Sequence, residues 1–393
     1  MLAALKNPSP AAEIIRKTEA FRTELPHVAN QLYLNHAAVS PLSARIVRGV
    51  EAFLKDRSEG DIENYAAVLM PTLASARMLV SRFINCDEKN LAFVPNTSYG
   101  LNILAQGLRW KTGDRIILGD EEFPSNVYPF LNLRQHGVEI DFVRAEDGKI
   151  LIEDIERLIT PQTKLVSVSY VQFLSGYRTD LALLARLCKA RGVLLATDAI
   201  QALGAMPIDC KAMGFDFLAA GCHKWAMSPM GNAVIYLTDD LLARLDTAYV
   251  GWLSVKDAWN MLDYNLELLD DAKRFELGTM NWIGLVGLNE AFKVFDELGS
   301  DVIAEKILCN TDYLSSQLEA AGFEPLLNCT RENRSGIVTI KNVEGPEAVV
   351  QQLLEKKIKV ATRCGMIRVS PHFYNSTAEL DVFVSELRTV CKR

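Results

Sequence analysis

The sequence lacks the features that would place it in a membrane, on a nucleic acid or in a secretion pathway. No apolar run approaches the length needed to span a bilayer. The first residues, MLAALKNPSPAAEIIRK, contain too short an apolar stretch for a signal peptide, and two prolines interrupt it. No run of Lys or Arg stands out, and the net charge is −7. We therefore expect a cytoplasmic protein with neither nucleic-acid nor membrane partners.

The sequence also lacks the cysteine spacing of disulfide frameworks and zinc sites. Its eight cysteines are scattered, and no two form a CxxC pair. This predicts reduced thiols and no metal site. No GxGxxG follows a predicted strand, and the P-loop, the HExxH pair and the GxSxG elbow are missing too. The common nucleotide, zinc-protease and serine-hydrolase motifs therefore do not explain this chain.

Short apolar or β-branched runs alternate with longer helical patterns from about residue 90 to 237. One helical pattern, DLALLARLCKARG (180–192), has the leucine spacing of a helix, with Gly192 where a C-terminal cap is expected. Strands that alternate with helices predict a mainly parallel sheet covered on both faces. The strand candidates are 91–95, 115–118, 138–143, 164–171, 193–197, 215–220 and 232–237.

The pattern changes after about residue 280, which predicts a smaller α+β domain. Its expected helices are 282–298, 302–321, 346–356 and 376–391, and its expected strands are 336–340, 358–362 and 366–370. We expect an N-terminal helix at about 11–23 to pack on it. The 393-residue chain is long enough for two domains. We predict a large domain at 30–279 and a small domain made of 1–29 and 280–393.

Polar residues directly follow three of the predicted strands. Asp198 follows strand 193–197, and the sequence GCHKW places Lys224 just after strand 215–220. Strand 91–95 is followed by Asn-Thr-Ser and a helical pattern, which together offer hydroxyls and free backbone N–H groups to an anion. Ligands of doubly wound sheets bind at the carboxyl ends of strands. We therefore expect a carboxylate, a lysine and an anion cradle at one edge of one sheet.

Each of these features has an ordinary structural explanation when it is taken alone. Asn-Thr-Ser before a helix is usually an N-cap, Asp198 could pair with a surface cation, and Lys224 could extend to solvent. Pyridoxal phosphate needs all three together. Its aldehyde needs a lysine, its ring nitrogen needs a carboxylate, and its phosphate suits a helix N-terminus. The combination therefore predicts a pyridoxal-phosphate enzyme.

These motifs resemble those of fold-type I pyridoxal-phosphate enzymes of the class V aminotransferase family, which includes cysteine desulfurases, selenocysteine lyases and isopenicillin N epimerase-like proteins. The resemblance extends from YLNHAAVSP (33–41) to IRVSPHFYNS (367–376). It implies an α/β fold: a three-layer αβα large domain with a mainly parallel sheet, and a smaller α+β C-terminal domain. It also implies a homodimer with active sites shared between subunits.

The resemblance assigns roles to particular residues. Lys224 is the expected Schiff-base lysine and catalytic residue, Asp198 the partner of the pyridine nitrogen, and Gln201 a ligand of the phenolic oxygen. Arg368 is expected to bind the substrate α-carboxylate as a bidentate fork. The other expected cofactor contacts are Asn96, Thr97 and Ser98 near the phosphate, His223 on the phosphate, Phe123 on the ring, Gln172 near the ring oxygen, and Thr279 on the phosphate of the neighbouring subunit. The expected substrate side includes His36 and Ala37, and its aromatic lining is expected from Phe123, Phe173 and Trp252, the last of which could equally lie in the core or the dimer interface.

Three positions depart from the cysteine desulfurase pattern. Phe123 stands where many of these enzymes have a histidine, so it can stack on the ring but cannot transfer a proton. Cys364 lies only four residues before Arg368, which favours a small residue in a tight turn over a persulfide-forming thiol on a mobile loop. Gly221 stands where many relatives have a phosphate-binding serine.

These departures leave the cofactor machinery in place and the reaction outcome open. The leading prediction is an enzyme that removes the Cα proton of an amino acid, with transamination, epimerisation or elimination as the outcome. The alternative is a cysteine desulfurase or selenocysteine lyase. A further alternative is a binding protein that keeps the fold without catalysis, against which the set of Asp198, Lys224 and Arg368 argues.

Overall fold

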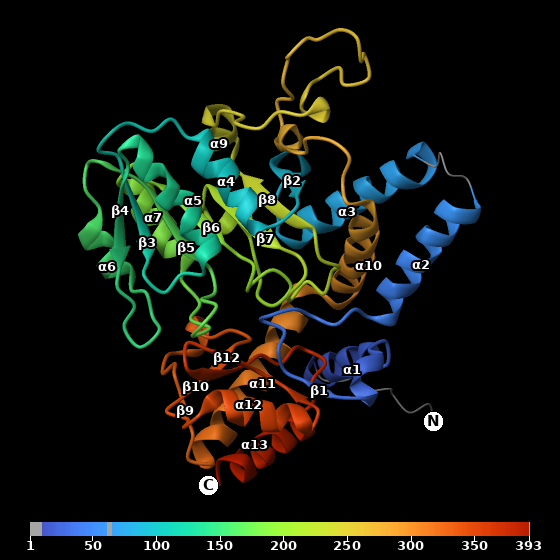
Figure 1. The fold of residues 1–393 in the computed structure, drawn as a ribbon, viewed down its shortest axis with the longest axis vertical. Helices are drawn as coiled ribbons and strands as arrows, with labels where there is room; N and C mark the ends of the chain where they lie inside the picture. The colour runs from blue at the N-terminus through green and yellow to red at the C-terminus, as the bar shows by residue number, and fades with distance from the viewer. Residues whose placement is uncertain (1–9, 61–64, 393) are drawn as a thin grey trace, which may run out of the picture.

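A seven-stranded sheet forms the centre of the larger part of the molecule (Figure 1). The computed structural model describes residues 10–60 and 65–392. The strand order is β2-β8-β7-β6-β5-β3-β4, and only β8 runs antiparallel to its neighbours. The strands are β2 (Leu91–Val94), β3 (Arg115–Gly119), β4 (Glu139–Val143), β5 (Thr163–Ser169), β6 (Leu194–Asp198), β7 (Phe217–Gly221) and β8 (Ala233–Leu237).

Helices cover both faces of this sheet because its strands are apolar on both sides. In β7, Phe217 and Ala219 join the apolar cluster that includes helix α4, whereas Leu218 and Ala220 join the cluster that includes α3, α7 and α10. The predicted three-layer α/β architecture with a mainly parallel sheet is therefore confirmed. The helices of this part are α2 (Ala44–Glu59), α3 (Met70–Phe83), α4 (Thr97–Gly107), α5 (Tyr128–Leu131), α6 (Ile152–Leu158), α7 (Leu181–Ala190), α8 (Cys210–Met213), α9 (Asp239–Arg244) and α10 (Trp282–Leu298).

The C-terminal part contains a four-stranded antiparallel sheet of order β12-β13-β10-β9, with helices packed beside it (Figure 1). The predicted strand at 358–362 is two short strands, because β11 pairs with β1 and β12 pairs with β13. The elements are β1 (Leu32–Tyr33), β9 (Glu324–Pro325), β10 (Val338–Lys341), β11 (Ile358–Lys359), β12 (Ala361–Arg363), β13 (Met366–Val369), α1 (Pro10–Arg22), α11 (Ser300–Ala320), α12 (Pro346–Glu355) and α13 (Thr377–Cys391).

Helices α1 and α10 pack on different parts of the molecule. Helix α1 packs beside α11, and Arg22 at its end forms two hydrogen bonds of 2.8 Å with Glu379 of α13. Helix α10 packs on α2 and α3 and shares their apolar cluster with the large sheet. The domain boundary expected at residue 279 stays a prediction, and the helix that follows it lies in a layer covering the large sheet.

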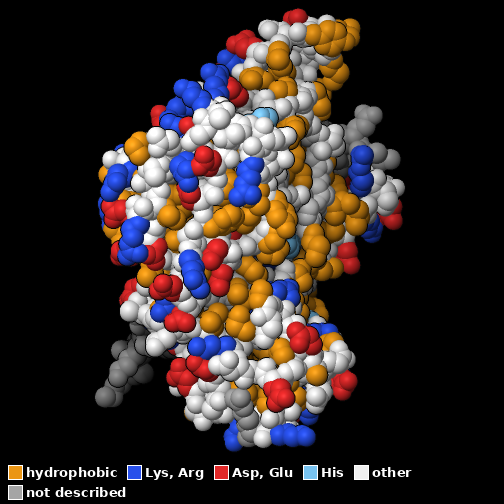
Figure 2. Space-filling view, turned by 60° about the vertical axis from the view of Figure 1, so that its left-hand side comes forward, with side chains coloured by type: hydrophobic (Ala, Val, Ile, Leu, Met, Phe, Trp, Pro, Cys, Tyr) orange, Lys and Arg blue, Asp and Glu red, His pale blue; other side chains and the backbone are white. Residues whose placement is uncertain are grey.

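The segment between Val255 and Leu268 projects from the large part at the top of Figure 1. Its ends are joined by an antiparallel bridge between those two residues. Leu262 and Tyr264 are 86% and 90% exposed, and Figure 2 shows apolar side chains on the projecting end. Within residues 10–60 and 65–392, no helix combines the length and the apolarity that crossing a membrane requires.

Candidate active site

A cavity of about 320 Å³ lies at the carboxyl edge of the large sheet, where the β12–β13 hairpin also lines it. It is bounded by residues that follow β2, β6 and β7 and by two residues of the hairpin. Because β2, β6 and β7 run in the same direction, their ends meet at one edge. The lining residues are Ala37, Ala38, Asn96, Thr97, Ser98, Phe123, Ser125, Phe173, Ile200, Gln201, His223, Lys224, Arg363 and Arg368.

Lys224 lies in this cavity three residues after β7, and it is only 9% exposed. Burial lowers the pKa of its amine to about 8, because desolvation disfavours the ammonium form. The Asp198 carboxylate opposes this shift, whereas Arg368 and Arg363 add to it. The amine nitrogen lies 5.5 Å from the centre of the Phe123 ring. A lysine amine with a pKa near neutrality can act as a nucleophile and as a base.

Asp198 is the last residue of β6; it does not line the cavity, but its charge acts on Lys224, which does. Its side chain is 2% exposed and accepts a 2.9 Å hydrogen bond from the backbone N–H of Ile200. Burial raises the pKa of this carboxyl to about 6, against the lowering effects of that hydrogen bond and of Lys224. A buried carboxylate at this place is suited to hold a cationic ring nitrogen.

The N-terminus of helix α4 forms one wall of the cavity. Asn96 caps the helix, accepting a 2.9 Å hydrogen bond from the backbone N–H of Tyr99. The Thr97 hydroxyl accepts from the backbone N–H of Gly221 at 2.9 Å, which ties this wall to the end of β7. The Ser98 hydroxyl donates to Ser125 at 2.9 Å. Hydroxyls and backbone N–H groups at a helix N-terminus suit a phosphate.

His223 adds a further polar group to the same lining. Burial lowers the pKa of its imidazole, and the neighbouring Lys224 lowers it further. The ring can therefore donate a hydrogen bond to an anion while it remains neutral.

Arg368 on β13 is a buried cation with no carboxylate partner among the described residues. It is 2% exposed, and its Nη1 donates a 2.7 Å hydrogen bond to the carbonyl of Phe173. Its Nε has no hydrogen-bond partner within the described residues. Burial lowers the pKa of the guanidinium to about 9, and Arg363 contributes. A buried guanidinium that lines a cavity and has no carboxylate partner among the described residues is suited to bind one.

Aromatic rings line the side of the cavity near Lys224. Phe123 and Phe173 pack edge to face, with ring centres 5.3 Å apart, and Phe123 is 39% exposed. Both were expected in the lining. Trp252, the third aromatic candidate, lies elsewhere: it lines a different groove and packs against Trp259. Trp252 therefore does not line this cavity of its own chain, and the alternative of a dimer interface stays a prediction.

Two predicted cofactor contacts are already bonded within the protein. The Gln201 amide lines the cavity, donating to the carbonyl of Ala37 at 3.0 Å and accepting from the indole of Trp225 at 2.8 Å. Gln172 is outside the lining, and its amide donates to Glu122 at 2.9 Å. The Oε1 of Gln172 is buried without a hydrogen-bond partner among the described residues.

Glu122 is a buried carboxyl that sequence reasoning did not identify as part of the site. It accepts hydrogen bonds from the backbone and the hydroxyl of Ser169 and from Gln172. Burial raises its pKa to about 7, and Asp198 adds to this rise. The only signal in the sequence was an acidic pair, Glu121-Glu122, directly before Phe123. That pattern alone cannot distinguish a buried carboxyl from an exposed one.

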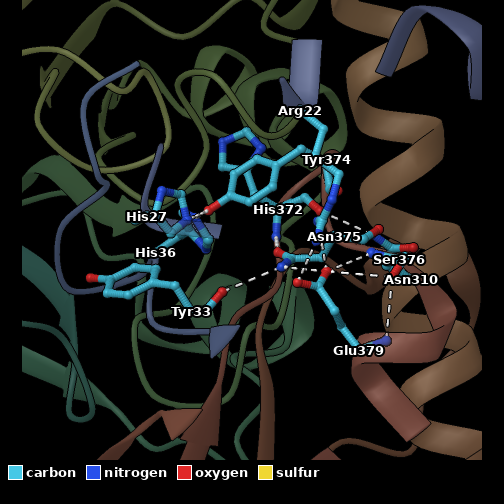
Figure 3. A network of polar contacts seen from close by, with 10 residues as sticks. All are labelled: Arg22, His27, Tyr33, His36, Asn310, His372, Tyr374, Asn375, Ser376 and Glu379. Atoms are coloured by element: carbon cyan, nitrogen blue, oxygen red, sulfur yellow. Dashed lines mark hydrogen bonds and ion pairs between the residues drawn. The ribbon is translucent and has the colours of Figure 1, made fainter. Parts of the chain in front are cut away.

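His36 lies behind the cavity, whereas its neighbour Ala37 lines it. Figure 3 shows His36 in a network with Tyr374 and His27. Its Nδ1 lies 2.8 Å from the carbonyl of Ser370, and its Nε2 lies 2.7 Å from the Tyr374 hydroxyl. Burial lowers the pKa of His36 well below its usual value. The predicted substrate contact of His36 stays a prediction, and its observed contacts join the N-terminal segment to the residues after β13.

Comparisons with known proteins agree with this arrangement. Residues 32–383 match the family described as aminotransferase class-V. The chain belongs to the class-V aminotransferase family. This is a family of pyridoxal-phosphate-dependent enzymes. Members similar to the chain include a probable cysteine desulfurase from Methanothermobacter thermautotrophicus, 28% identical and covering 96% of this chain and 99% of that protein. Another is the uncharacterized aminotransferase YcbU of Bacillus subtilis, which is 26% identical over 94% of this chain and 97% of that protein.

Solved structures share the same class-V fold. The apo structure of a cysteine desulfurase from Thermococcus onnurineus has a TM-score of 0.87 at 24% identity, covering 95% of this chain and 98% of that one. The cystine C-S lyase C-DES in complex with cysteine persulfide has a TM-score of 0.85 at 22% identity, covering 92% of this chain and 98% of that one. At these identities the likeness establishes the fold.

In this class-V protein, Cys364 occupies a two-residue turn rather than a long loop. It follows Arg363 at the end of β12 and precedes Gly365 and Met366, which begins β13. The φ angles of Cys364 and Gly365 are 49° and 72°, both in the left-handed region that such hairpin turns require. The expectation of a residue in a tight turn is confirmed. Cys364 is exposed and does not line the cavity.

Thr279 lies outside the cavity of its own chain. It is exposed and borders an apolar groove of about 1200 Å³ beside α2 and α3. The groove is lined by residues that include Leu54, Met70, Trp252 and Ile283. The structure therefore does not bring Thr279 together with the other predicted site residues of this class-V protein.

Proposed function

We propose that this protein is a pyridoxal-phosphate-dependent enzyme that removes the Cα proton of an amino acid substrate. The single observation that carries the proposal is the gathering of a buried lysine, a carboxylate beneath it, a helix N-terminus and a free guanidinium around one cavity. No simpler ligand requires all four groups together.

The residues fit the cofactor in charge and in hydrogen-bonding capacity. Lys224 would hold its aldehyde carbon, Asp198 its ring nitrogen, and Phe123 one face of its ring. The N-terminus of α4, with Thr97 and Ser98, would hold its phosphate, together with His223. Gln201 would contact the ring oxygen with the second hydrogen of its amide nitrogen. Bound in this way, pyridoxal phosphate supplies an electron sink for negative charge at the substrate Cα.

The protein's own residues would then perform binding and proton transfer. Arg368 binds the substrate α-carboxylate and fixes which bond at Cα faces the ring. The amine of Lys224 would take the Cα proton of the bound substrate on its nitrogen. The carboxylate of Asp198 would hold the ring nitrogen of the cofactor in its protonated form. The side chain of Phe123 cannot transfer a proton. Lys224 would therefore be the group that removes protons from the substrate Cα or delivers them to it.

The test is the visible absorption spectrum of the reconstituted protein, recorded before and after a panel of amino acids is added. We expect a yellow band in the wild type that Lys224→Ala loses or shifts, and a spectral change with the substrate class. A folded wild type that stays colourless with added pyridoxal phosphate would contradict the proposal and favour a non-catalytic binding protein. Circular dichroism of both proteins controls for folding.

Cysteine desulfurase or selenocysteine lyase activity is the second candidate, because several similar proteins bear the name probable cysteine desulfurase. This activity would convert the amino acid to alanine and transfer the sulfur or selenium to a thiol as a persulfide or its selenium analogue, from which an added thiol reductant would release sulfide or selenide. The tight turn around Cys364 disfavours a mobile persulfide carrier at this position. Full activity in Cys364→Ala would rule out a relay through that thiol, and loss of activity with retained cofactor binding would support it.

We also propose that the protein is a homodimer with shared active sites. Thr279 is exposed beside the apolar groove, where Trp252 and Ile283 are 43% and 47% exposed. A second copy would cover these side chains and bring Thr279 toward the partner's phosphate site. Light scattering should give twice the chain mass of 43.7 kDa, and a monomer at micromolar concentration would contradict this arrangement.

A cytoplasmic location is the compartment that we propose. It is supported by eight cysteines without a disulfide between them in the described structure. Fractionation of cells that express the tagged protein would test it.

A further inference from the structure

The β12–β13 hairpin presents two arginines to the cavity. Arg363 and Arg368 both line it, although the resemblance to known enzymes required only Arg368. In the antiparallel register, Arg363 pairs with Met366 and Ala361 pairs with Arg368. Side chains two positions apart lie on the same face of a strand, so all four of these residues share one face. The two arginines are diagonal neighbours on that face.

The two-residue turn fixes this arrangement. Cys364 and Gly365 both have positive φ, which matches the twist of a short hairpin and sets its register. A shift of one residue in β12 would turn Arg363 to the opposite face and Thr362 toward the cavity. The tight turn therefore determines that the side chains of Arg363 and Arg368 both face the cavity.

The positive charge in the cavity is not matched by acidic groups. Lys224, Arg363 and Arg368 line it, and the lining contains no aspartate or glutamate within the described residues. Asp198 is outside the lining, and its carboxylate interacts electrostatically with Lys224. Neither Arg363 nor Arg368 forms an ion pair with a described carboxylate, and Arg363 donates a 2.7 Å hydrogen bond only to the carbonyl of Thr362. Clustered cations of this kind are costly unless anions are bound between them.

The expected ligands of the proposed enzyme do not use all of these cations. The phosphate has the N-terminus of α4 and His223, and the substrate α-carboxylate has Arg368. Arg363 is left without an anion. It is partly buried, more exposed than Arg368, and lies on the same face of the hairpin. A group that extends from the substrate Cα toward solvent would meet it.

We propose that Arg363 binds an anionic group on the substrate side chain, so that the preferred substrates are amino acids with a second carboxylate or a comparable anion. This inference rests on the proposed function, because it uses the same cavity and the same cofactor. It assigns Arg363 as a specificity-determining residue and Arg368 as the residue for the α-carboxylate, common to all amino acids.

The test compares L-aspartate with L-asparagine, which have nearly the same shape and differ in the charge of the side chain. Apparent dissociation constants come from the change in visible absorption of the reconstituted protein. We expect wild type to bind L-aspartate at least about 10-fold more tightly, the value of one charge-assisted hydrogen bond. In Arg363→Gln this preference should disappear through weaker binding of aspartate, while asparagine changes by less than about 3-fold. Arg363→Lys should recover part of the preference.

Other results would overturn the inference. Equal affinity of wild type for the two amino acids would contradict it, without any variant being needed. A loss of cofactor affinity in Arg363→Gln with an unchanged aspartate preference would assign the arginine to the phosphate instead. Arg82→Gln, which removes an exposed arginine paired with Asp296, is the matched control and should change nothing. A wild type without a covalent cofactor band would overturn the proposed function, and this inference with it.

Discussion

The two sides of the cavity differ in how their polar groups are satisfied. On the sheet side, Asp198 and Thr97 accept hydrogen bonds from backbone N–H groups, and Ser98 donates to a neighbouring hydroxyl. On the hairpin side, Arg363 and Arg368 have carbonyl partners but no anion in the described structure. The sheet side is organised in advance, as a permanently held cofactor requires. The hairpin side keeps its charge available, as an exchanging substrate requires.

The largest expected effect is on turnover, and it comes from substitution of Asp198 on the sheet side. Asp198→Asn keeps the shape of the side chain but cannot hold a protonated ring nitrogen by charge. We expect turnover to fall on the order of 10²- to 10³-fold, a typical loss for one preorganised electrostatic group. Steady-state kinetics with the cofactor-loaded variant measures this. Unchanged turnover would show that the carboxylate does not act on the ring.

Substitution of Arg368 on the hairpin side should weaken substrate binding and leave cofactor binding unchanged. Arg368→Met removes the guanidinium, so the apparent substrate dissociation constant should rise about 10- to 100-fold. The cofactor spectrum should stay the same. Without ligand the variant should be no less stable than wild type, because a buried unpaired cation is replaced by an apolar group. Lost cofactor binding would contradict the separation of the two sides.

The carboxyl of Glu122 makes the sheet side sensitive to pH. Its pKa in the folded protein is about 7, above its ordinary value of 4.5, so the folded state binds more protons between these values. Its contribution to stability should therefore decrease as pH rises from about 4.5 to 7, by on the order of 3 kcal/mol. Glu122→Gln should lose this slope in urea unfolding of the cofactor-free protein. Glu51→Gln, on an exposed position of α2, should keep it.

The hydrogen-bond network of Tyr374, His27 and His36 should make a smaller contribution, which is to the free energy of unfolding. Tyr374→Phe removes the hydroxyl that lies 3.0 Å from Nε2 of His27 and 2.7 Å from Nε2 of His36. A buried imidazole nitrogen then loses its partner, which should lower the free energy of unfolding by about 1–3 kcal/mol. Tyr128→Phe, at an exposed tyrosine, should change it little. Equal stability of Tyr374→Phe and wild type would show that water replaces the hydroxyl.

The smallest effect is expected at the turn of the hairpin. Cys364→Asn places a residue that tolerates positive φ at the same position. Stability should stay within about 0.5 kcal/mol of wild type and the aspartate preference should persist. A large loss of turnover with an intact hairpin would instead indicate a chemical role for the thiol.

The same contrast explains what could be predicted from the sequence. Asp198 and Lys224 were found because each directly follows an apolar strand, and parallel strands end at one edge. Arg363 was not assigned a role, because the direction of its side chain depends on the register that the two-residue turn sets between β12 and β13. The consecutive Cys-Gly between two alternating runs was the available signal. The burial of His36 and Glu122 depends on contacts with distant segments, which local patterns do not contain.

The most direct measurement is a crystal structure of Lys224→Ala reconstituted with pyridoxal phosphate and soaked with L-aspartate. The cofactor should lie on the sheet side, with its ring nitrogen at Asp198 and its phosphate at the N-terminus of α4. The α-carboxylate should contact Arg368 and the side-chain carboxylate Arg363. A cofactor bound elsewhere, or an α-carboxylate away from Arg368, would contradict the division of the cavity into a cofactor side and a substrate side.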